Sequence, residues 1–273
     1  MARRASVIFT TYNQPEWLRK VLWGYECQTE KDFEIVIADD GSGEETKRVI
    51  DEFKTNSQLN IKHVWHPDEG YQKCPILNKA VIASESDYLI FSDGDCIPRK
   101  DFVEVHLKYA EPGYFLSGGT LRLPLDLSRK ILREDVEEER AFDLRWLYDN
   151  GLPRTFKSTK LLQSKWYPKF MNRLTPTKAS WNGHNSSGWK KDIIAVNGFN
   201  ENMHYGGQDR ELGERLQNYG IKSRQIRYSA VCIHLEHERP YKTKESIRRN
   251  KAIRSEVKKK HTWWVENGID KYM

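Results

Sequence analysis

The sequence predicts one α/β domain whose central sheet is mostly parallel and is flanked by helices. Three observations indicate this fold class. Short apolar, β-branched runs alternate with helix-compatible stretches through the N-terminal third of the chain. Polar clusters follow several of those runs, where ligands bind in parallel sheets. The length of 273 residues suits one large domain with a generous core.

The strands expected in this first part are short runs rich in Val, Ile and Phe. They lie at 6–10, 33–38, 60–65 and 88–92. Helices are expected between them at 15–27, 43–56 and 75–84. Pro15 suits the first turn of its helix, since proline is tolerated where the helical N–H has no partner. Strands that alternate with helices favour parallel pairing through right-handed crossovers.

The pattern weakens in the middle of the chain and then returns. A charged helix is expected over 128–149, inside a segment, 120–180, that we interpret as an insert beside the cleft. Further elements are expected beyond Trp181. They are a helix at 189–195, a turn at Asn197-Gly198, a helix that begins near Asp209 and a strand at 229–233. In the helix near Asp209, one face carries Leu212, Leu216 and Tyr219, with Gly220 suited to its C-terminal end.

These elements predict a domain over 1–240. Its parts are a nucleotide-binding half (1–119), the insert (120–180) and an acceptor and catalytic half (181–240). A basic helical tail (241–273) follows, with its helix expected at 243–265. The tail holds ten Lys or Arg and four Asp or Glu, a difference of +6 that equals the net charge of the whole chain.

Composition narrows the class of protein. The apolar runs are too short to span a bilayer, and the N-terminus lacks the order of a signal peptide, so we expect a cytoplasmic protein. The four cysteines are widely spread and lack C-x-x-C spacing, which favours small buried side chains over disulfides or a zinc site. They are Cys27, Cys74, Cys96 and Cys232.

The basic tail allows two interpretations. Its cations and Trp263-Trp264 suit a helix on an anionic membrane, at the inner face, where a lipid-linked acceptor would be presented. A solvated helix packed on the domain fits equally well. We expect no nucleic-acid partner, because no nucleic-acid motif accompanies the basic segment.

Asp93-Gly94-Asp95 places two carboxylates directly after the strand at 88–92. One such triplet is expected by chance in an Asp-rich chain, and its ordinary meaning is a solvated turn. The triplet is stronger evidence for a binding site because Thr10 to Asn13 and Asp39-Asp40 also follow predicted strands. Carboxylate oxygens suit Mn²⁺ or Mg²⁺, and these cations bind diphosphates. The three clusters together favour nucleotide recognition.

This combination resembles the inverting family 2 glycosyltransferases, which have the A-type glycosyltransferase fold. The resemblance rests on residues 7–13, 35–42, 70–78 and 93–95. A second part, residues 197–212, resembles the C-terminal catalytic motif of the galactosyltransferase-type branch, usually written NGFDE followed by WGGED. This chain has Tyr205 where that branch has Trp and Gln208 where it has Glu.

The resemblance implies a role for each matching residue. For the nucleotide and donor they are Thr10, Tyr12, Asn13, Asp39, Lys73, Asn78, Asp93, Gly94 and Asn185. Asp39 would accept a hydrogen bond from a base N–H, which favours uracil. Asp95 would bind the Mn²⁺ or Mg²⁺ ion together with His234 or His237. A structural role for either histidine is the alternative.

Asp209 is the residue that the resemblance implies as the base for the acceptor hydroxyl. The dipole of the helix that begins there stabilises its anion, which makes it reliably ionised but a weak base. A plain helix cap is the alternative. The acceptor-binding candidates are Trp181, Tyr205, Gly207 and Gln208. Either aromatic could instead belong to the core.

The sequence therefore predicts a metal-dependent transferase that moves a hexose or N-acetylhexosamine from a UDP-sugar to a glycan or glycolipid in surface polysaccharide synthesis. Two alternatives stay open. One is an inactive module that binds a nucleotide sugar or glycan, made conceivable by Gln208. The other is a sugar-nucleotide nucleotidyltransferase, although the stretch after the first strand lacks the Gly-rich basic loop of that class.

Overall fold

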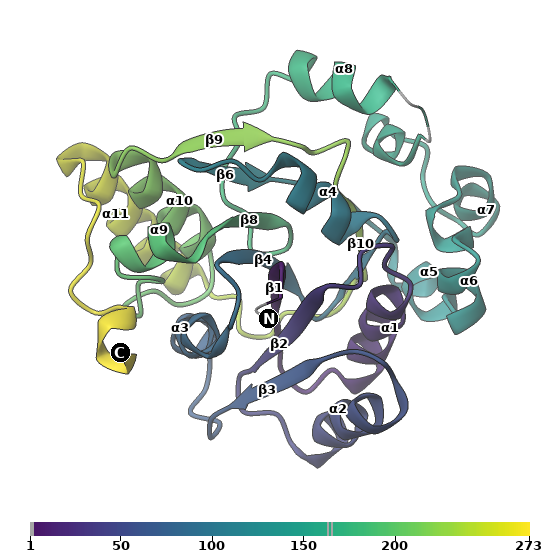
Figure 1. Cartoon of the computed structure of the whole chain (residues 1–273), viewed down its shortest axis with the longest axis horizontal. Coiled ribbons are helices and arrows are strands. Elements are labelled where there is room, and N and C mark those ends of the chain that lie inside the picture. Colours follow the sequence, from purple (N-terminus) through teal and green to yellow (C-terminus); the bar gives the residue numbers. More distant parts are fainter. Residues whose placement is uncertain (1–2, 163, 165) are drawn as a thin grey trace.

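A computed structural model describes residues 3–162, 164 and 166–273. Its main sheet has seven strands in the order β3-β2-β1-β4-β8-β6-β9, and a small sheet has the order β5-β10-β7 (Figure 1). The strands are β1 (Ala5–Thr11), β2 (Phe33–Asp39), β3 (Ile61–Trp65), β4 (Tyr88–Asp93), β5 (Cys96–Pro98), β6 (Tyr114–Ser117), β7 (Gly119–Arg122), β8 (Ser186–Trp189), β9 (Lys222–Gln225) and β10 (Val231–His234). The four N-terminal strands confirm the predicted ones.

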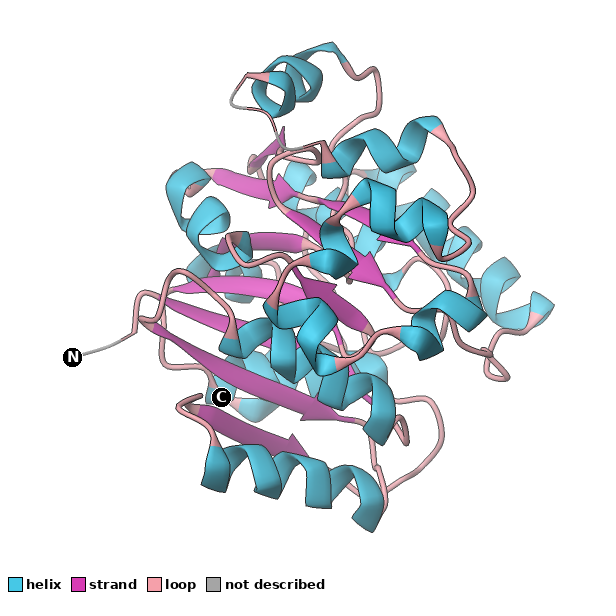
Figure 2. Ribbon diagram, turned by 90° about the vertical axis from the view of Figure 1, so that its right-hand side faces the viewer, coloured by secondary structure: helices cyan, strands magenta, loops and turns pink. Residues whose placement is uncertain are grey.

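Helices cover both faces of the main sheet (Figures 1 and 2). They are α1 (Pro15–Glu26), α2 (Glu44–Asn56), α3 (Lys73–Ala83), α4 (Phe102–Tyr109), α5 (Leu125–Lys130), α6 (Arg133–Glu137), α7 (Leu144–Asp149), α8 (Tyr167–Leu174), α9 (Lys190–Ala195), α10 (Gln208–Asn218) and α11 (Lys244–Lys260). Three 3₁₀ turns are η1 (Arg140–Phe142), η2 (Phe156–Leu161) and η3 (Ile269–Tyr272). The predicted α/β class with a mostly parallel sheet is confirmed.

The sheet separates two hydrophobic clusters. Val7 and Phe9 of β1 belong to the cluster with α1 and α2, whereas Ile8 belongs to the cluster with α3, α9 and α10. This division follows from the strand period of two, which sends successive side chains to opposite faces. Both faces are apolar, as expected for parallel strands covered by helices.

The register of β1 aligns the polar ends of three strands. β1 pairs in parallel with β2 on one side and with β4 on the other. Thr11 lies opposite Asp39, and Thr10 lies opposite Asp93. The polar clusters that the sequence placed after separate strands therefore meet at one edge of the sheet.

The prediction of one charged helix over 128–149 is wrong. The structure has α5, α6, η1 and α7 there, broken where Ile131 is extended and Glu139 has φ of 58°. Buried apolar residues recur too irregularly for one helical face, so the chain must turn to bury them. They are Leu127, Ile131, Val136, Ala141, Phe142 and Leu147.

Two further helix predictions need correction. Leu212 and Leu216 are buried on α10 as predicted, but Tyr219 follows the helix and is 44% exposed. Gly220 has φ of +104°, which fits the predicted C-terminal position. α11 ends at Lys260 rather than near 265, because His261 adopts the left-handed conformation.

The tail packs on the domain. Asn250 of α11 donates hydrogen bonds to the carbonyls of His204 and Gly206, and Arg254 pairs with Glu214 of α10. Ile269 is buried in the cluster that includes α3. Among the described residues, none of the helices is both long and apolar enough to cross a membrane. All four cysteines are free, and Cys27 is half-buried rather than buried.

Candidate active site

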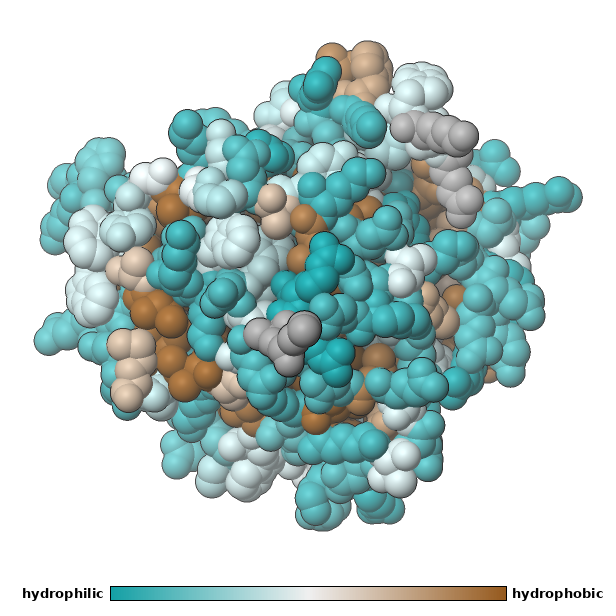
Figure 3. Space-filling model, viewed as in Figure 1, coloured by the Kyte–Doolittle hydropathy of each residue, from teal (hydrophilic) through white to brown (hydrophobic). Residues whose placement is uncertain are grey.

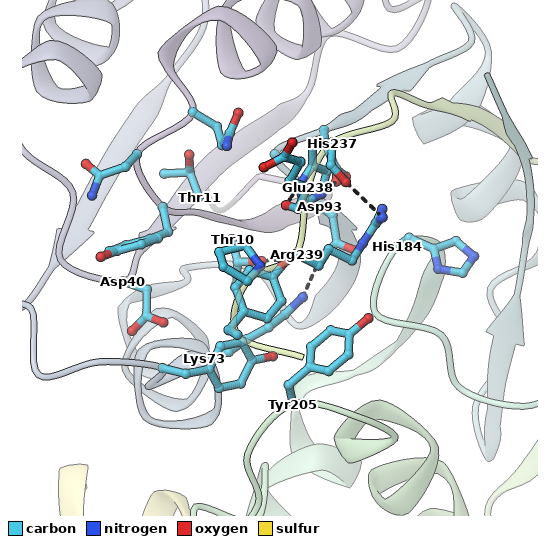
Figure 4. A pocket seen from close by; sticks show the side chains of 18 of the residues that line it. Thr10, Thr11, Asp40, Lys73, Asp93, His184, Tyr205, His237, Glu238 and Arg239 are labelled. Atoms are coloured by element: carbon cyan, nitrogen blue, oxygen red, sulfur yellow. Dashed lines mark hydrogen bonds and ion pairs between the residues drawn. The ribbon is translucent and has the colours of Figure 1, made fainter. Parts of the chain in front are cut away.

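A cavity of about 640 Å³ opens at the carboxyl ends of β1 and β4. Thirteen of the seventeen site residues predicted from the sequence line it. They are Thr10, Tyr12, Asn13, Lys73, Asp93, Gly94, Asp95, Tyr205, Gly207, Gln208, Asp209, His234 and His237. Figure 4 shows side chains from both halves of the chain around this space. Its size suits a small organic ligand.

Asp39 does not reach the cavity. It is fully buried, and its Oδ1 accepts from the backbone N–H of Ser42 at 2.8 Å. Its Oδ2 lies 2.8 Å from Nε2 of His63. These contacts hold the turn after β2, so the role that Asp39 was predicted to have at a nucleobase is not supported by its position.

The next residue, Asp40, lines the cavity. Its Oδ2 accepts from the backbone N–H of Gln72 at 2.9 Å, and Nε2 of His66 lies 2.8 Å from Oδ1. Lys79 contacts Nδ1 of His66 at 3.2 Å, which makes Nδ1 the acceptor and leaves the proton on Nε2 to donate to Asp40. Burial raises the pKa of Asp40.

Three other predicted residues are also buried in structural positions. Asn78 of α3 donates to the carbonyl of Phe199 and accepts from the backbone N–H of the same residue. Asn185 donates to the carbonyls of Gly119 and Ala230. Trp181 is fully buried against Phe91 and Phe115. None of the three lines the cavity, so the donor and acceptor contacts predicted for them are corrected to packing roles.

Asp95 contacts both His234 and His237, while the group whose ligand atoms all lie within 4.8 Å of one another is Asp95, Cys96 and His234. Oδ2 of Asp95 lies 2.8 Å from Nε2 of His237 and 3.6 Å from Nε2 of His234. Nδ1 of each histidine contacts a backbone carbonyl, that of Leu235 or Glu238. Nδ1 of each ring therefore donates to that carbonyl, and each Nε2 faces the carboxylate, with its lone pair when the ring is neutral and with its N–H when the ring is protonated.

Burial opposes a charge on His237, but Asp95 raises the pKa of its imidazole, so this cluster attracts positive charge, whether a proton on the ring or a metal ion. Burial alone would raise the pKa of Asp95, but His234 and His237 lower it far below its usual value. Cys96 also lies close, with its Sγ donating to Asp95. Burial raises the pKa of the Cys96 thiol well above its usual value, and a sulfur ligand suits softer metals than Mn²⁺ or Mg²⁺. A carboxylate with imidazole fits Mn²⁺ better than Mg²⁺, which takes oxygen ligands.

Asp93 is held by two side chains. Nζ of Lys73, the first residue of α3, lies 2.6 Å from its Oδ1, and the Thr10 hydroxyl donates to the same oxygen at 3.2 Å. Burial opposes the ammonium charge, but Asp93 and other nearby anions raise the pKa of Lys73 well above its usual value. Lys73 therefore places a permanent positive charge inside the cavity.

The backbone around Gly94 is crowded. Its N–H donates to the carbonyl of Thr10 at 2.8 Å, and a Cβ at Gly94 would lie 2.6 Å from that carbonyl oxygen. A larger residue would push β1 and the loop after β4 apart. The glycine thus fixes the spacing between Asp93 and Asp95.

Asp209 lies in the first turn of α10 and lines the cavity. Gly206 and Gly207 precede it with φ of +111° and +88°, and their backbone passes directly beside the cavity. Oδ2 of Asp209 accepts from the backbone N–H of Gly183 at 3.0 Å. The second oxygen of Asp209 is free of protein partners among the described contacts.

Tyr71, Tyr205 and Tyr241 form an aromatic wall of the cavity. Their ring centroids lie 5.0 to 6.0 Å apart. Gln208 donates to the Tyr71 hydroxyl at 2.9 Å and accepts from the N–H of Gly206 at 3.0 Å. Sequence reasoning found Tyr205 and Gln208 but missed the other two tyrosines, which carry no motif of their own.

Other lining residues were also missed. Arg122 at the end of β7 and Arg239 after β10 add two cations, and His184 lies beside the His234 ring. Burial lowers the pKa of His184 to about 4, so its imidazole is neutral near pH 7. Asp40 and Tyr71 lie inside segments on which the resemblance rests, whereas nothing in the sequence singled out Arg122.

Comparisons with known proteins agree with this geometry. Residues 6–173 match the model of glycosyl transferase family 2, and residues 176–244 match a model described as the N-terminal domain of galactosyltransferase. The Escherichia coli chondroitin synthase is 29% identical over 256 residues, which cover 85% of this chain and 34% of that protein. The chain therefore spans about a third of the length of that relative.

Two solved structures share the fold. The mannosyltransferase PcManGT from Pyrobaculum calidifontis, solved with GDP-Man and Mn²⁺, has a TM-score of 0.58 at 16% identity and covers 88% of this chain and 59% of that one. S. aureus TarS, solved with UDP-GlcNAc, has a TM-score of 0.56 at 14% identity and covers 87% of this chain and 60% of that one.

Proposed function

The chain belongs to glycosyl transferase family 2, and on that premise we propose that it transfers a hexose or N-acetylhexosamine from a UDP-sugar, with inversion, to a glycan or glycolipid acceptor. The observation that carries the proposal is the convergence of both halves on one cavity. The first half contributes Asp40, Asp93 and Asp95, and the second contributes Asp209 and the two histidines.

The nucleotide is recognised at the β1 and β2 side of the cavity. Asp40 offers carboxylate oxygens to a base N–H, which favours uracil, and Tyr12 offers an exposed ring nearby. Tyr12 is itself held by a hydrogen bond of 2.8 Å from its hydroxyl to Asp68. The UDP-GlcNAc in TarS and the GDP-Man in PcManGT are consistent with a nucleotide sugar as donor.

The diphosphate lies near the strand ends. Asp95 with His234 and His237 would hold a Mn²⁺ or Mg²⁺ ion, which neutralises charge on a leaving diphosphate when bound. Arg122, Arg239 and Lys73 add protein cations around the same space. Asp93, kept in place by Lys73, faces the ribose.

Asp209 acts as the base. It takes the proton of the acceptor hydroxyl as that oxygen forms a bond to the anomeric carbon, and the bond from this carbon to the diphosphate breaks on the opposite face. The electron pair leaves with the nucleoside diphosphate, and the configuration inverts. The N–H of Gly183 holds one oxygen of Asp209, which orients the other toward the acceptor.

The acceptor lies against the aromatic wall of Tyr71, Tyr205 and Tyr241, since aromatic faces pack on the apolar faces of sugars. Similarity to a chondroitin synthase supports polysaccharide synthesis as the process. A cytoplasmic location remains part of the proposal. So does a membrane contact of the 241–273 tail, where Trp263 and Trp264 are each 43% exposed.

The test is a panel of UDP-hexoses, UDP-N-acetylhexosamines and GDP-mannose with Mn²⁺, in which release of the nucleoside diphosphate is measured. We expect at least one UDP-sugar to be turned over, and Asp209→Asn to lose most of the rate while binding UDP as the native protein does. Nucleotide binding without turnover of any donor would favour the inactive module. Pyrophosphate release from a nucleoside triphosphate would favour the nucleotidyltransferase. Full activity of Asp209→Asn would overturn the base assignment alone.

A further inference from the structure

α8 exposes its apolar side chains. Trp166, Phe170 and Leu174 are 66%, 50% and 59% exposed, and none of the residues of α8 is buried. Their spacing of four residues places them on one stripe of the helix. A surface helix normally turns such a stripe toward the core.

Other side chains of α8 attach the helix to the domain. Asn172 donates to the hydroxyl of Ser229 at 2.8 Å, and its Oδ1 accepts from the backbone N–H of Tyr228 at 2.8 Å. Tyr167 meets the ring of Tyr228 edge to face. The helix is thus fixed with its apolar stripe turned outward.

The surroundings of α8 give it access to a large partner. It stands at the outer end of the molecule in both ribbon views, and apolar side chains gather at the same place in the space-filling view (Figures 1 to 3). Five of the thirteen exposed large apolar side chains of the described chain lie within 156–174. The other two are Phe156 and Leu162. Such a concentration on one segment marks an interaction site.

The charged side chains in the segment around the apolar stripe are all basic. Residues 150–189 contain seven Lys or Arg and no Asp or Glu. Lys169 and Arg173 lie on exposed positions of α8 itself, next to the stripe. Amphipathic helices with this combination lie in the interface of anionic bilayers, with apolar residues among the acyl chains and cations at the headgroups.

We propose that α8 docks this protein on an anionic lipid bilayer. Two arguments favour a bilayer over other occupants. A symmetric dimer through this face would set two groups of cations against each other. A glycan would leave Phe170 and Leu174 facing sugar hydroxyls without a hydrogen-bonding group, whereas acyl chains match them. No residue of α8 lines the cavity, so the docking surface is separate from the active site and does not depend on the transferase proposal.

Vesicle co-sedimentation with the full chain tests the proposal. The two lipid preparations are phosphatidylcholine alone and phosphatidylcholine mixed with phosphatidylglycerol. We expect binding to the mixed vesicles, weaker binding in high salt, and little binding to phosphatidylcholine alone. Phe170→Ser with Leu174→Ser should weaken binding about tenfold or more, and Lys169→Glu with Arg173→Glu by a similar factor. Circular dichroism and thermal melting should be unchanged, because these side chains contact solvent.

The matched control replaces an exposed apolar residue outside α8 and the tail, with Leu132→Ser, and should bind vesicles as the native chain does. A separate tail variant, Trp263→Ser with Trp264→Ser, measures what the tail adds to binding. Several outcomes would overturn the proposal. These are no binding of the native chain to mixed vesicles, native-like binding of the α8 variants, or loss of binding only in the tail variant. A dimer in sedimentation velocity that the α8 variants convert to monomer would assign the stripe to a second copy instead.

Discussion

Asp39 and Asp40 are neighbours in the chain, but only Asp40 faces the cavity. Asp39 is fully buried with His63, while Asp40 is held at the cavity by His66 and the N–H of Gln72. The two carboxylates therefore have different surroundings, one inside the fold and one at the cavity.

Substitution should separate these two roles. Asp40→Asn should weaken UDP binding about tenfold, because a hydrogen bond to a charged group is lost. It should also lower stability, since His66 or the N–H of Gln72 loses an acceptor. Asp39→Ala should lower the free energy of unfolding by about 2 kcal/mol, because buried groups lose their partner. Calorimetric titration with UDP and chemical denaturation check both. A larger loss of UDP affinity in a folded Asp39→Ala protein would return the base contact to Asp39.

The histidines should control binding of the cation. His234→Ala and His237→Ala should each weaken Mn²⁺ binding by at least about tenfold, since even outer-shell changes cost that much. Electron paramagnetic resonance of free Mn²⁺ in the presence of UDP measures this without relying on turnover. Cys96→Ser serves as the control and should keep native Mn²⁺ affinity. If only one histidine variant loses affinity, that residue alone is the ligand.

The buried ion pair on α10 should contribute strongly to the stability of the protein. Arg215 and Glu211 of α10 are both fully buried, and Arg215 also donates to the carbonyls of Val196 and Gly198. Arg215→Ala should lower the free energy of unfolding by about 3 to 5 kcal/mol, since it leaves Glu211 as an unpaired buried charge. Chemical denaturation gives the value. The control is Arg210→Ala, an exposed position on the same helix, which should change little.

His106 should make stability depend on pH. Burial lowers its pKa to about 4, against 6.5 for an ordinary histidine, and its nitrogens contact Asn185 and Ser187. The unfolded chain therefore takes up a proton at higher pH than the folded one. The stabilisation is fully present above about pH 6.5 and falls by about 3 kcal/mol as the pH approaches 4.

Denaturation at several pH values checks this expectation. His106→Gln, which has no group that titrates in this range, should show a smaller loss of stability between pH 6.5 and 4 than the native protein. Equal pH profiles for the two proteins would contradict the role of His106.

The sequence by itself determined the parallel core and the edge at which the site lies. Apolar strands that alternate with helices leave few arrangements, and parallel strands bring their carboxyl ends together. Local motifs then identified thirteen of the residues that line the cavity, among them Asp93, Asp95 and Asp209.

Only the tertiary structure decided which residues of those motifs face the cavity. Asp39 and Asp40 cannot be separated by residue type, because the direction of each side chain depends on the turn after β2. The motifs predict Asn78 and Asn185 as ligand contacts, but their hydrogen-bond partners come from segments distant in the chain. The broken helix in 128–149 and the outward stripe of α8 arise for the same physical reason: burial depends on which distant surface a helix meets, and the local pattern does not specify that surface.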